Sequence, residues 1–344
     1  MRSEFPMGFL PRLAIAGIGV LLVASMAVAQ APTGKAPPAA KAPPAGKSAT
    51  AAKAKGPVIP PREEVRLETR DKVQLSATYY PGWKENAKES VPVVLLHGWK
   101  GSRRDFTDLA QDLHSVGHAV LVPDLRGHGD STSVLLPGRT ETLSAATLTP
   151  QQFQRMGTYD MGAVKDFLWN KHNEGQLNLN RLVVVGAEMG ASAAVDFAHV
   201  DWSTPDYGPL QLGKFVKGLV LISPEYNYRG MNMRAALGNQ SVLRDIAVLI
   251  LVGRQDSRAI TEANRIHGIF ERYHPEPEGS KEEVASKRTL WLGPLDTRLQ
   301  GTGMLSASKL RVGNHIGRFI ELRAAGSPQG ATIEAWKPLK KPHE

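Results

Sequence analysis

The chain alternates short apolar runs with longer segments in which apolar residues recur every three or four positions. Runs of four to seven apolar, mostly β-branched residues predict buried parallel strands. They occupy residues 91–96, 119–122, 182–185, 218–222, 246–252 and 289–292. Helical spacing or composition predicts helices over residues 102–116, 149–172, 190–202, 258–273 and 309–323. Strands that alternate with helices in this way form a mostly parallel sheet covered by helices on both faces.

Three segments depart from this alternation. Residues 65–69 and 73–80 alternate apolar and polar positions and flank Arg70-Asp71-Lys72, which predicts an antiparallel hairpin at one edge of the sheet. With this hairpin the sheet has about eight strands. Residues 132–149 are polar and are expected to form a loop. The interval from residue 224 to 246 has room for one helix but for no large lid, so we expect a site there to be open to solvent.

The first 59 residues are predicted to lie outside the folded domain. Arg2 and Arg12 precede an apolar run that ends in Ala27-Val28-Ala29, which is the pattern of a secretory signal peptide cleaved after Ala29. The run is short for a membrane span, so an uncleaved anchor is the less favoured alternative. Residues 30–59 are rich in Ala, Pro and Lys and predict a disordered linker. We therefore expect residues 1–29 as signal peptide, 30–59 as linker, 60–325 as one domain, 326–344 as a flexible tail, and a periplasmic or extracellular location.

Charge and composition exclude several classes of function. The chain carries a net charge of +9. Residues 1–59 contain seven Lys or Arg residues and one Glu and so account for most of this charge, which leaves the predicted domain close to neutral. A nucleic-acid-binding domain concentrates basic residues on a folded face, and we expect no nucleic-acid partner. The linker is interpreted as a tether, with weak contact to an anionic polymer or a membrane surface as the alternative. The absence of cysteine excludes disulfides and Cys-based zinc sites, and we expect no metal and no cofactor.

The segment Gly186-Ala187-Glu188-Met189-Gly190 lies between a predicted strand and a predicted helix. Glycines at both ends allow the helix and the strand to approach closely, and the central residue of such a tight turn has a strained backbone. A strand, a Gly-x-X-x-Gly turn and a helix form a nucleophile elbow. Its central residue here is Glu188.

Three further motifs follow the ends of predicted strands. They are His97-Gly98-Trp99, the segment from Asp124 to Ser131 with the sequence DLRGHGDS, and Gly253-Arg254-Gln255-Asp256. Together with the elbow, and in this order, they resemble the α/β-hydrolase superfamily, in particular its single-domain esterase, lipase and peptidase-like branch. The resemblance covers about residues 65–323 and implies an α/β-hydrolase fold.

The same resemblance implies the roles of five residues. Glu188 stands at the position of the nucleophile, Asp256 at that of the acid, and Gln300 at that of the histidine. Trp99 and Met189 stand where the backbone donors of the oxyanion hole are found. Asp256 is equally well explained as the cap of the following helix.

Serine hydrolysis requires a hydroxyl that attacks, an imidazole that takes its proton and an acid that orients the imidazole. A Gln amide cannot shuttle a proton near neutral pH, and no histidine lies between His274 and His315. Glu188 is then either a carboxylate nucleophile or a plug. As a plug, its carboxylate would accept hydrogen bonds from the Met189 and Trp99 N–H groups and occupy the oxyanion hole. We favour the plug, and thus a degenerate triad of Glu188, Asp256 and Gln300.

Three hypotheses of function follow. The first is an exported, catalytically inactive α/β-hydrolase-fold protein that binds an unidentified small molecule or envelope component. The second is an active carboxylic ester hydrolase with unorthodox residues, which requires a histidine close to the elbow. The third is an envelope protein that binds polyanions through its Lys/Pro-rich arm.

Overall fold

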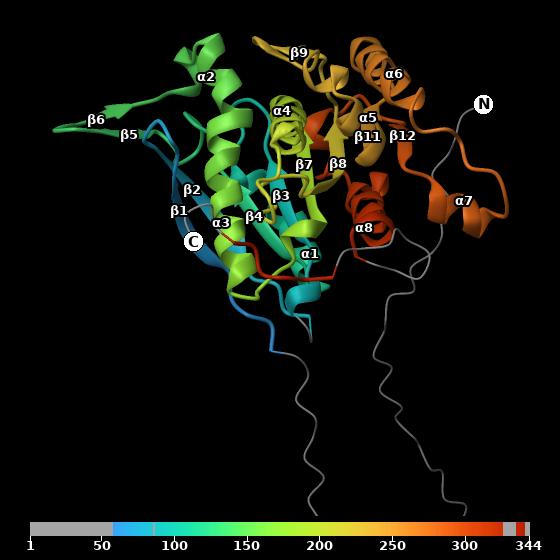
Figure 1. Ribbon diagram of the computed structural model, residues 1–344. Coiled ribbons are helices and arrows are strands. Elements are labelled where there is room, and N and C mark those ends of the chain that lie inside the picture. The colour runs from blue at the N-terminus through green and yellow to red at the C-terminus, as the bar shows by residue number, and fades with distance from the viewer. Residues whose placement is uncertain (1–57, 85–86, 326–334, 341–344) are drawn as a thin grey trace, which may run out of the picture. The chain divides into compact units, whose positions relative to one another are not determined.

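Ten strands form a single sheet in the computed structural model, which describes residues 58–84, 87–325 and 335–340 (Figure 1). Their order is β12-β11-β8-β7-β3-β4-β2-β5-β6, and β1 pairs with β2. This arrangement confirms the predicted α/β-hydrolase fold, with two strands more than expected. The predicted signal peptide and almost all of the predicted linker lie outside the described residues. Within the described residues, no helix is both long and apolar enough to cross a bilayer.

The central strands are parallel because helices connect them across the faces of the sheet. They are β3 (Pro92–Leu96), β4 (Ala119–Pro123), β7 (Leu182–Ala187), β8 (Val216–Ile222), β11 (Ala247–Gly253) and β12 (Leu290–Leu295). β3, β4, β7 and β11 are buried along their whole length, as their continuous apolar runs predict. β1 (Glu63–Glu68) and β2 (Val73–Tyr80) form the predicted antiparallel hairpin, with Arg66 opposite Ser76.

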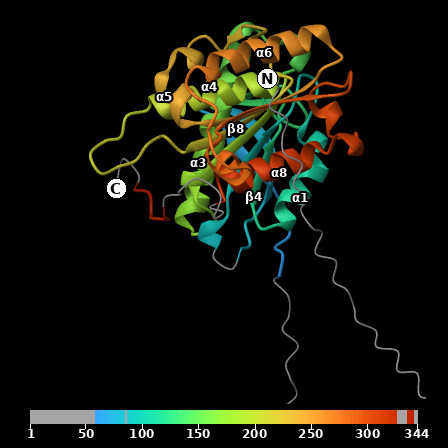
Figure 2. The same cartoon turned by 90° about the vertical axis from the view of Figure 1, so that its right-hand side faces the viewer.

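Two apolar layers, one on each face of the sheet, contain the core. On one face the sheet packs against α3 (Met161–Asn173), α4 (Met189–Ser203), α5 (Gln240–Asp245) and α6 (Ser257–Glu271). On the other it packs against α1 (Thr107–Ser115) and α8 (Val312–Arg323). Figure 2 shows these two layers of helices from the side. The remaining α-helices are α2 (Pro150–Arg155) and α7 (Lys281–Lys287), and the π-helix η4 (Met156–Asp160) leads from α2 into α3.

The helix predicted over residues 149–172 is interrupted by η4. Gly157 lies in this π-helix, where a Cβ atom would come within 2.5 Å of the Cβ of Asp196 on α4. The interruption therefore accompanies a close approach of the two helices, which residue spacing alone does not reveal.

The segment predicted as a polar loop contains a hairpin, β5 (Ser133–Leu136) and β6 (Arg139–Thr142), which extends the sheet beyond β2. The prediction missed it because all four residues of β6 are exposed and polar, so no alternation marks the strand. The interval from residue 224 to 246 also differs from its prediction. Besides one helix, α5, it contains a short hairpin, β9 (Asn227–Tyr228) and β10 (Met231–Asn232).

Part of the segment expected to be a flexible tail is packed against the domain. Leu339 is buried, and its backbone N–H and C=O are hydrogen bonded to the side chain of Asn173 at the end of α3. The ring of Trp336 stacks on His172 and donates a hydrogen bond to its carbonyl oxygen. The prediction is therefore wrong for residues 335–340, because one Leu and one Trp in a polar segment give no periodic signal.

Candidate functional site

The turn between β7 and α4 has the strained geometry predicted for a nucleophile elbow. Glu188 has φ 49° and ψ −108°, in a region that residues other than glycine rarely adopt. A Cβ atom on Gly186 would overlap the backbone of Gly190, and one on Gly190 would overlap the carbonyl of Leu96. The two glycines are therefore required by close backbone approach, as the sequence predicts.

The Glu188 side chain lies between two loops that follow other strands of the sheet. A Cβ atom added to Gly98, after β3, would overlap Oε2 of Glu188. A Cβ atom added to Gly301, after β12, would lie 2.7 Å from Cδ and 2.9 Å from Oε1. The half-buried carboxylate thus lies between the backbones of two glycines. Burial, and secondarily the Glu225 carboxylate, raise the pKa of Glu188 above its usual value.

The predicted hydrogen bond that would fix this carboxylate is not formed at α4. The side chain of Glu188 makes no capping hydrogen bond with the first backbone N–H groups of α4, which begins at Met189. The expectation that the Met189 N–H binds the Glu188 carboxylate is therefore wrong. Steric enclosure by the flanking loops, rather than hydrogen bonding to the helix N-terminus, defines the position of Glu188.

Gln300 is held by groups on the neighbouring strand ends. Its Nε2 donates to the carbonyl of Gly253 at 2.8 Å, and its Oε1 accepts from the Ser223 hydroxyl at 2.6 Å and from the Gly253 N–H at 3.2 Å. The Ser223 hydroxyl in turn accepts from the N–H of Gly301 at 2.9 Å. The amide thus links the ends of β8 and β11 to the loop that contacts Glu188.

Ser223 is a residue of the site that none of the four sequence motifs contains. It has φ 50° directly after β8, and it joins Gln300 to Gly301 through one hydroxyl group. Its position at the carboxyl end of the strand beside the elbow strand is the signal that identifies it. Ser192, one turn into α4, is buried and donates to the carbonyl of Glu225 at 3.3 Å.

Asp256 caps α6. Its Oδ1 accepts from the backbone N–H groups of Arg258 and Ala259, both at 3.0 Å. In the described part of the chain, the hydrogen bonds of Asp256 and those of Gln300 do not join the two residues. The family resemblance places Asp256 at the position of the acid and Gln300 at that of the histidine. Both residues therefore lie next to the end of β11, but their hydrogen bonds do not connect them to one another.

His97 fixes the loop that carries Gly98. Its Nε2 accepts from the N–H of Leu125 at 3.0 Å, so Nδ1 carries the proton and donates to the Gly98 carbonyl at 2.7 Å. Burial lowers the pKa of this fully buried imidazole to about 4. Both ring nitrogens are occupied by structural hydrogen bonds, which leaves neither available to relay a proton to the elbow.

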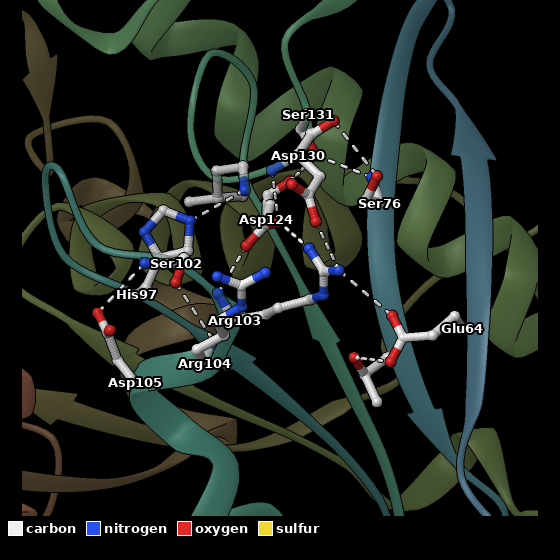
Figure 3. A network of polar contacts seen from close by, with 12 residues as sticks. Glu64, Ser76, His97, Ser102, Arg103, Arg104, Asp105, Asp124, Asp130 and Ser131 are labelled. Carbon is white, nitrogen blue, oxygen red and sulfur yellow. Dashed lines mark hydrogen bonds and ion pairs between the residues drawn. The ribbon is translucent and has the colours of Figure 1, made fainter.

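The motif from Asp124 to Ser131 has a structural role beside this loop (Figure 3). The buried carboxylate of Asp124 accepts from the backbone N–H of Arg103 at 2.6 Å and from its guanidinium group, and from the N–H of Asp130 at 2.9 Å. Arg103 also forms an ion pair with Asp130 at 2.8 Å. These contacts join the turn after β4 to the start of the helical segment that follows Gly98.

Trp99 lies under the tip of the β9–β10 hairpin. The guanidinium of Arg229 is 3.9 Å from the centre of the Trp99 ring and 5.9 Å from that of Phe153. Arg229 has φ 46°, and Gly230 follows it with φ 96°. The Nε1 of Trp99 is buried and has no acceptor among the described residues. The interval after β8 therefore partly covers the loop after β3, where an open side was expected.

Metal ligation receives no support from the described residues, among which no group of three or more His, Asp or Glu side chains could hold an ion.

Comparison with known proteins agrees with this architecture. A family model described as "Alpha/beta hydrolase family" matches residues 93–341, well over half of the chain. An uncharacterized protein of Mycobacterium tuberculosis is 29% identical over 142 residues, which are 41% of this chain and 42% of that protein. The chain thus spans less than half the length of the curated relatives it matches.

Solved structures share the fold at low sequence identity. An esterase from Pyrococcus furiosus matches with a TM-score of 0.51 and 16% identity, over 76% of this chain and 90% of that chain. An acylaminoacyl peptidase from Pyrococcus horikoshii matches with a TM-score of 0.53 and 11% identity, over 79% of this chain and 43% of that one. At these identities the likeness concerns the fold alone.

Proposed function

Because the chain belongs to the alpha/beta hydrolase family, we propose that it is a non-hydrolytic member of that family which binds a small molecule or an envelope component. In this proposal Glu188 and Gln300 replace the nucleophile and the general base. The fold is kept as a binding scaffold, and the chemistry is lost.

The position of Glu188 is the observation that carries this proposal. Its side chain lies against Gly98 and Gly301. These glycines belong to the two loops between which an attacking oxygen and a substrate carbonyl would have to meet. A carboxylate in that space adds negative charge where an ester carbonyl would develop it, and it opposes the reaction that an oxyanion hole promotes.

The contacts of Gln300 and His97 support the same conclusion. The Gln300 amide is bound to the Gly253 backbone and to Ser223, and it cannot accept a proton from a nucleophile near neutral pH. His97, in the loop beside the elbow, uses both ring nitrogens in structural hydrogen bonds. Neither Gln300 nor His97 is therefore available as the general base that serine hydrolysis requires.

A second candidate, an ester hydrolase that uses Glu188 itself, is favoured by one observation. The raised pKa of Glu188 brings this carboxyl group closer to the range that suits a general acid or base. The first candidate is preferred because a covalent ester on Glu188 would still need an activated water to clear.

Export of the protein to the cell envelope is part of the proposal and is supported by the sequence alone. The basic start, the apolar run and Ala27-Val28-Ala29 fit a signal peptide, and residues 30–59 fit a tether. A polyanion-binding role of this arm is the remaining alternative. Deletion of residues 30–59 should leave retention on an anionic polymer unchanged if the arm is only a tether.

Hydrolysis of p-nitrophenyl esters of graded acyl length tests the main proposal. The wild-type protein and the Glu188→Ala variant should both give only the background rate of the buffer. Turnover by the wild type that the Glu188→Ala variant loses would refute the proposal and establish the second candidate. Turnover that both proteins retain, and that a Ser192→Ala variant loses, would equally refute it and identify a different nucleophile.

A further inference from the structure

The outer edge of β6 is unpaired within the described sheet. β6 pairs with β5 alone, and all four of its residues, Arg139-Thr140-Glu141-Thr142, are exposed. Figure 1 shows the β5–β6 hairpin projecting from the side of the sheet. Unpaired strand edges present rows of free backbone donors and acceptors, and proteins usually protect them.

The hydrogen bonds around β5 identify which groups of β6 face outward. On the side of β5 that faces β2, the N–H of Leu135 donates to the carbonyl of Lys72. On the side that faces β6, the N–H of Leu143, just after β6, donates to the carbonyl of Thr132, just before β5. Because alternate residues of an antiparallel strand bond to opposite neighbours, Val134 and Leu136 bond to Glu141 and Arg139. The backbone groups of Thr140 therefore point away from β5, toward the free edge.

We propose that two copies of this chain associate through this edge, with their β6 strands antiparallel about a two-fold axis at Thr140. In this register the two Thr140 residues exchange two N–H···O=C hydrogen bonds. Arg139 of each copy then lies opposite Glu141 of the other. The two sheets become continuous across the axis.

Charge favours a second copy as the occupant of this edge. Within one chain Arg139 and Glu141 form an ion pair at 2.7 Å, and their side chains are 69% and 50% exposed. When two copies of the segment run antiparallel about Thr140, each Arg139 faces a Glu141 of the other copy, so the pairing provides two inter-subunit ion pairs. An edge protected by charges of one sign would instead repel its own copy.

An exposed apolar side chain points to the same pairing. Leu135 is 44% exposed and lies opposite Thr140 in the β5–β6 register, on the face away from Arg139 and Glu141. In the proposed dimer the two Leu135 side chains flank the pair of Thr140 residues and become partly covered. Because the shared ladder is short, the buried area of this interface is at the low end of the range for protein–protein interfaces, and the association is weak.

Sedimentation velocity of the full chain, from micromolar to millimolar concentration at low salt, tests the proposal. The wild type should shift reversibly from monomer to dimer as concentration rises. Arg139→Glu and Glu141→Arg place like charges opposite each other and should each weaken the dimer by about tenfold. The double variant Arg139→Glu/Glu141→Arg restores the complementary pattern and should regain wild-type association.

A mixture of the two single variants provides the sharpest measurement. Arg139→Glu and Glu141→Arg should form a mixed dimer, because each supplies the charge that the other lacks. Arg66→Glu on β1, an exposed residue with the same charge change as Arg139→Glu, is the matched control and should behave as wild type. A protein that stays monomeric, single variants that associate normally, or a mixture that behaves as its separate components would each overturn the proposal.

Discussion

The enclosure of Glu188 between two glycines makes a quantitative prediction for the Gly301→Ala variant. Gly301 has φ 55°, so an alanine there costs about 1 kcal/mol in the left-handed region. The new Cβ would also lie 2.7 Å from Cδ, 2.9 Å from Oε1 and 3.0 Å from Cγ of Glu188. Overpacking of this kind costs about 1–3 kcal/mol, so the variant should lose roughly 2–4 kcal/mol of unfolding free energy.

The same substitution in a Glu188→Ala background isolates the contact. The three atoms nearest to the new methyl group all lie beyond the Cβ of Glu188, so in the Glu188→Ala background chiefly the backbone cost of about 1 kcal/mol should remain. The double-mutant cycle should therefore give a coupling free energy of about 1–3 kcal/mol. Alanine at position 188 leaves the backbone strain of the elbow as it is, which restricts the comparison to the carboxylate.

Urea unfolding followed by circular dichroism measures all four proteins of the cycle. Gly303→Ala is the matched control, since a Cβ atom there meets nothing within 4 Å. It should change stability by less than about 0.5 kcal/mol. If Gly301→Ala loses the same free energy with and without Glu188, the carboxylate does not lie between these loops, and the reasoning behind the proposed function fails.

Three further predictions concern residues around the site. Burial lowers the pKa of His97 to about 4, so between about pH 6.5 and 4 the unfolded chain binds a proton that the folded chain does not. The free energy of unfolding should therefore fall by about 3 kcal/mol as the pH falls through this window. A pH series of urea unfolding should show a smaller fall for His97→Gln. Asp256→Ala should cost about 1 kcal/mol by the same assay while Asp256→Asn costs less, since Asn also caps helices; equal losses would contradict a capping role. Leu339→Ala should cost about 2–4 kcal/mol and speed amide exchange at the end of α3, and unchanged exchange there would show that residues 335–340 do not stabilise it.

Much of the site's framework follows from the sequence because local rules determine it. The glycines of the elbow predict a close approach of strand and helix, and the strained backbone of Glu188 follows from the same turn. The order of apolar runs predicts the parallel sheet, and the carboxyl ends of parallel strands meet at one edge. That is why Glu188, Ser223 and Gln300, far apart in the chain, converge there.

Contacts between loops were decided only by the tertiary structure. No spacing in the sequence indicates that Gly98 and Gly301 enclose Glu188, or that Arg229 stacks on Trp99, because these residues lie on segments that meet only after the sheet has formed. The same holds for Leu339 at the end of α3 and for the exposed strand β6. Periodicity reports which face of an element is buried, whereas the partner of a particular side chain depends on how distant loops pack.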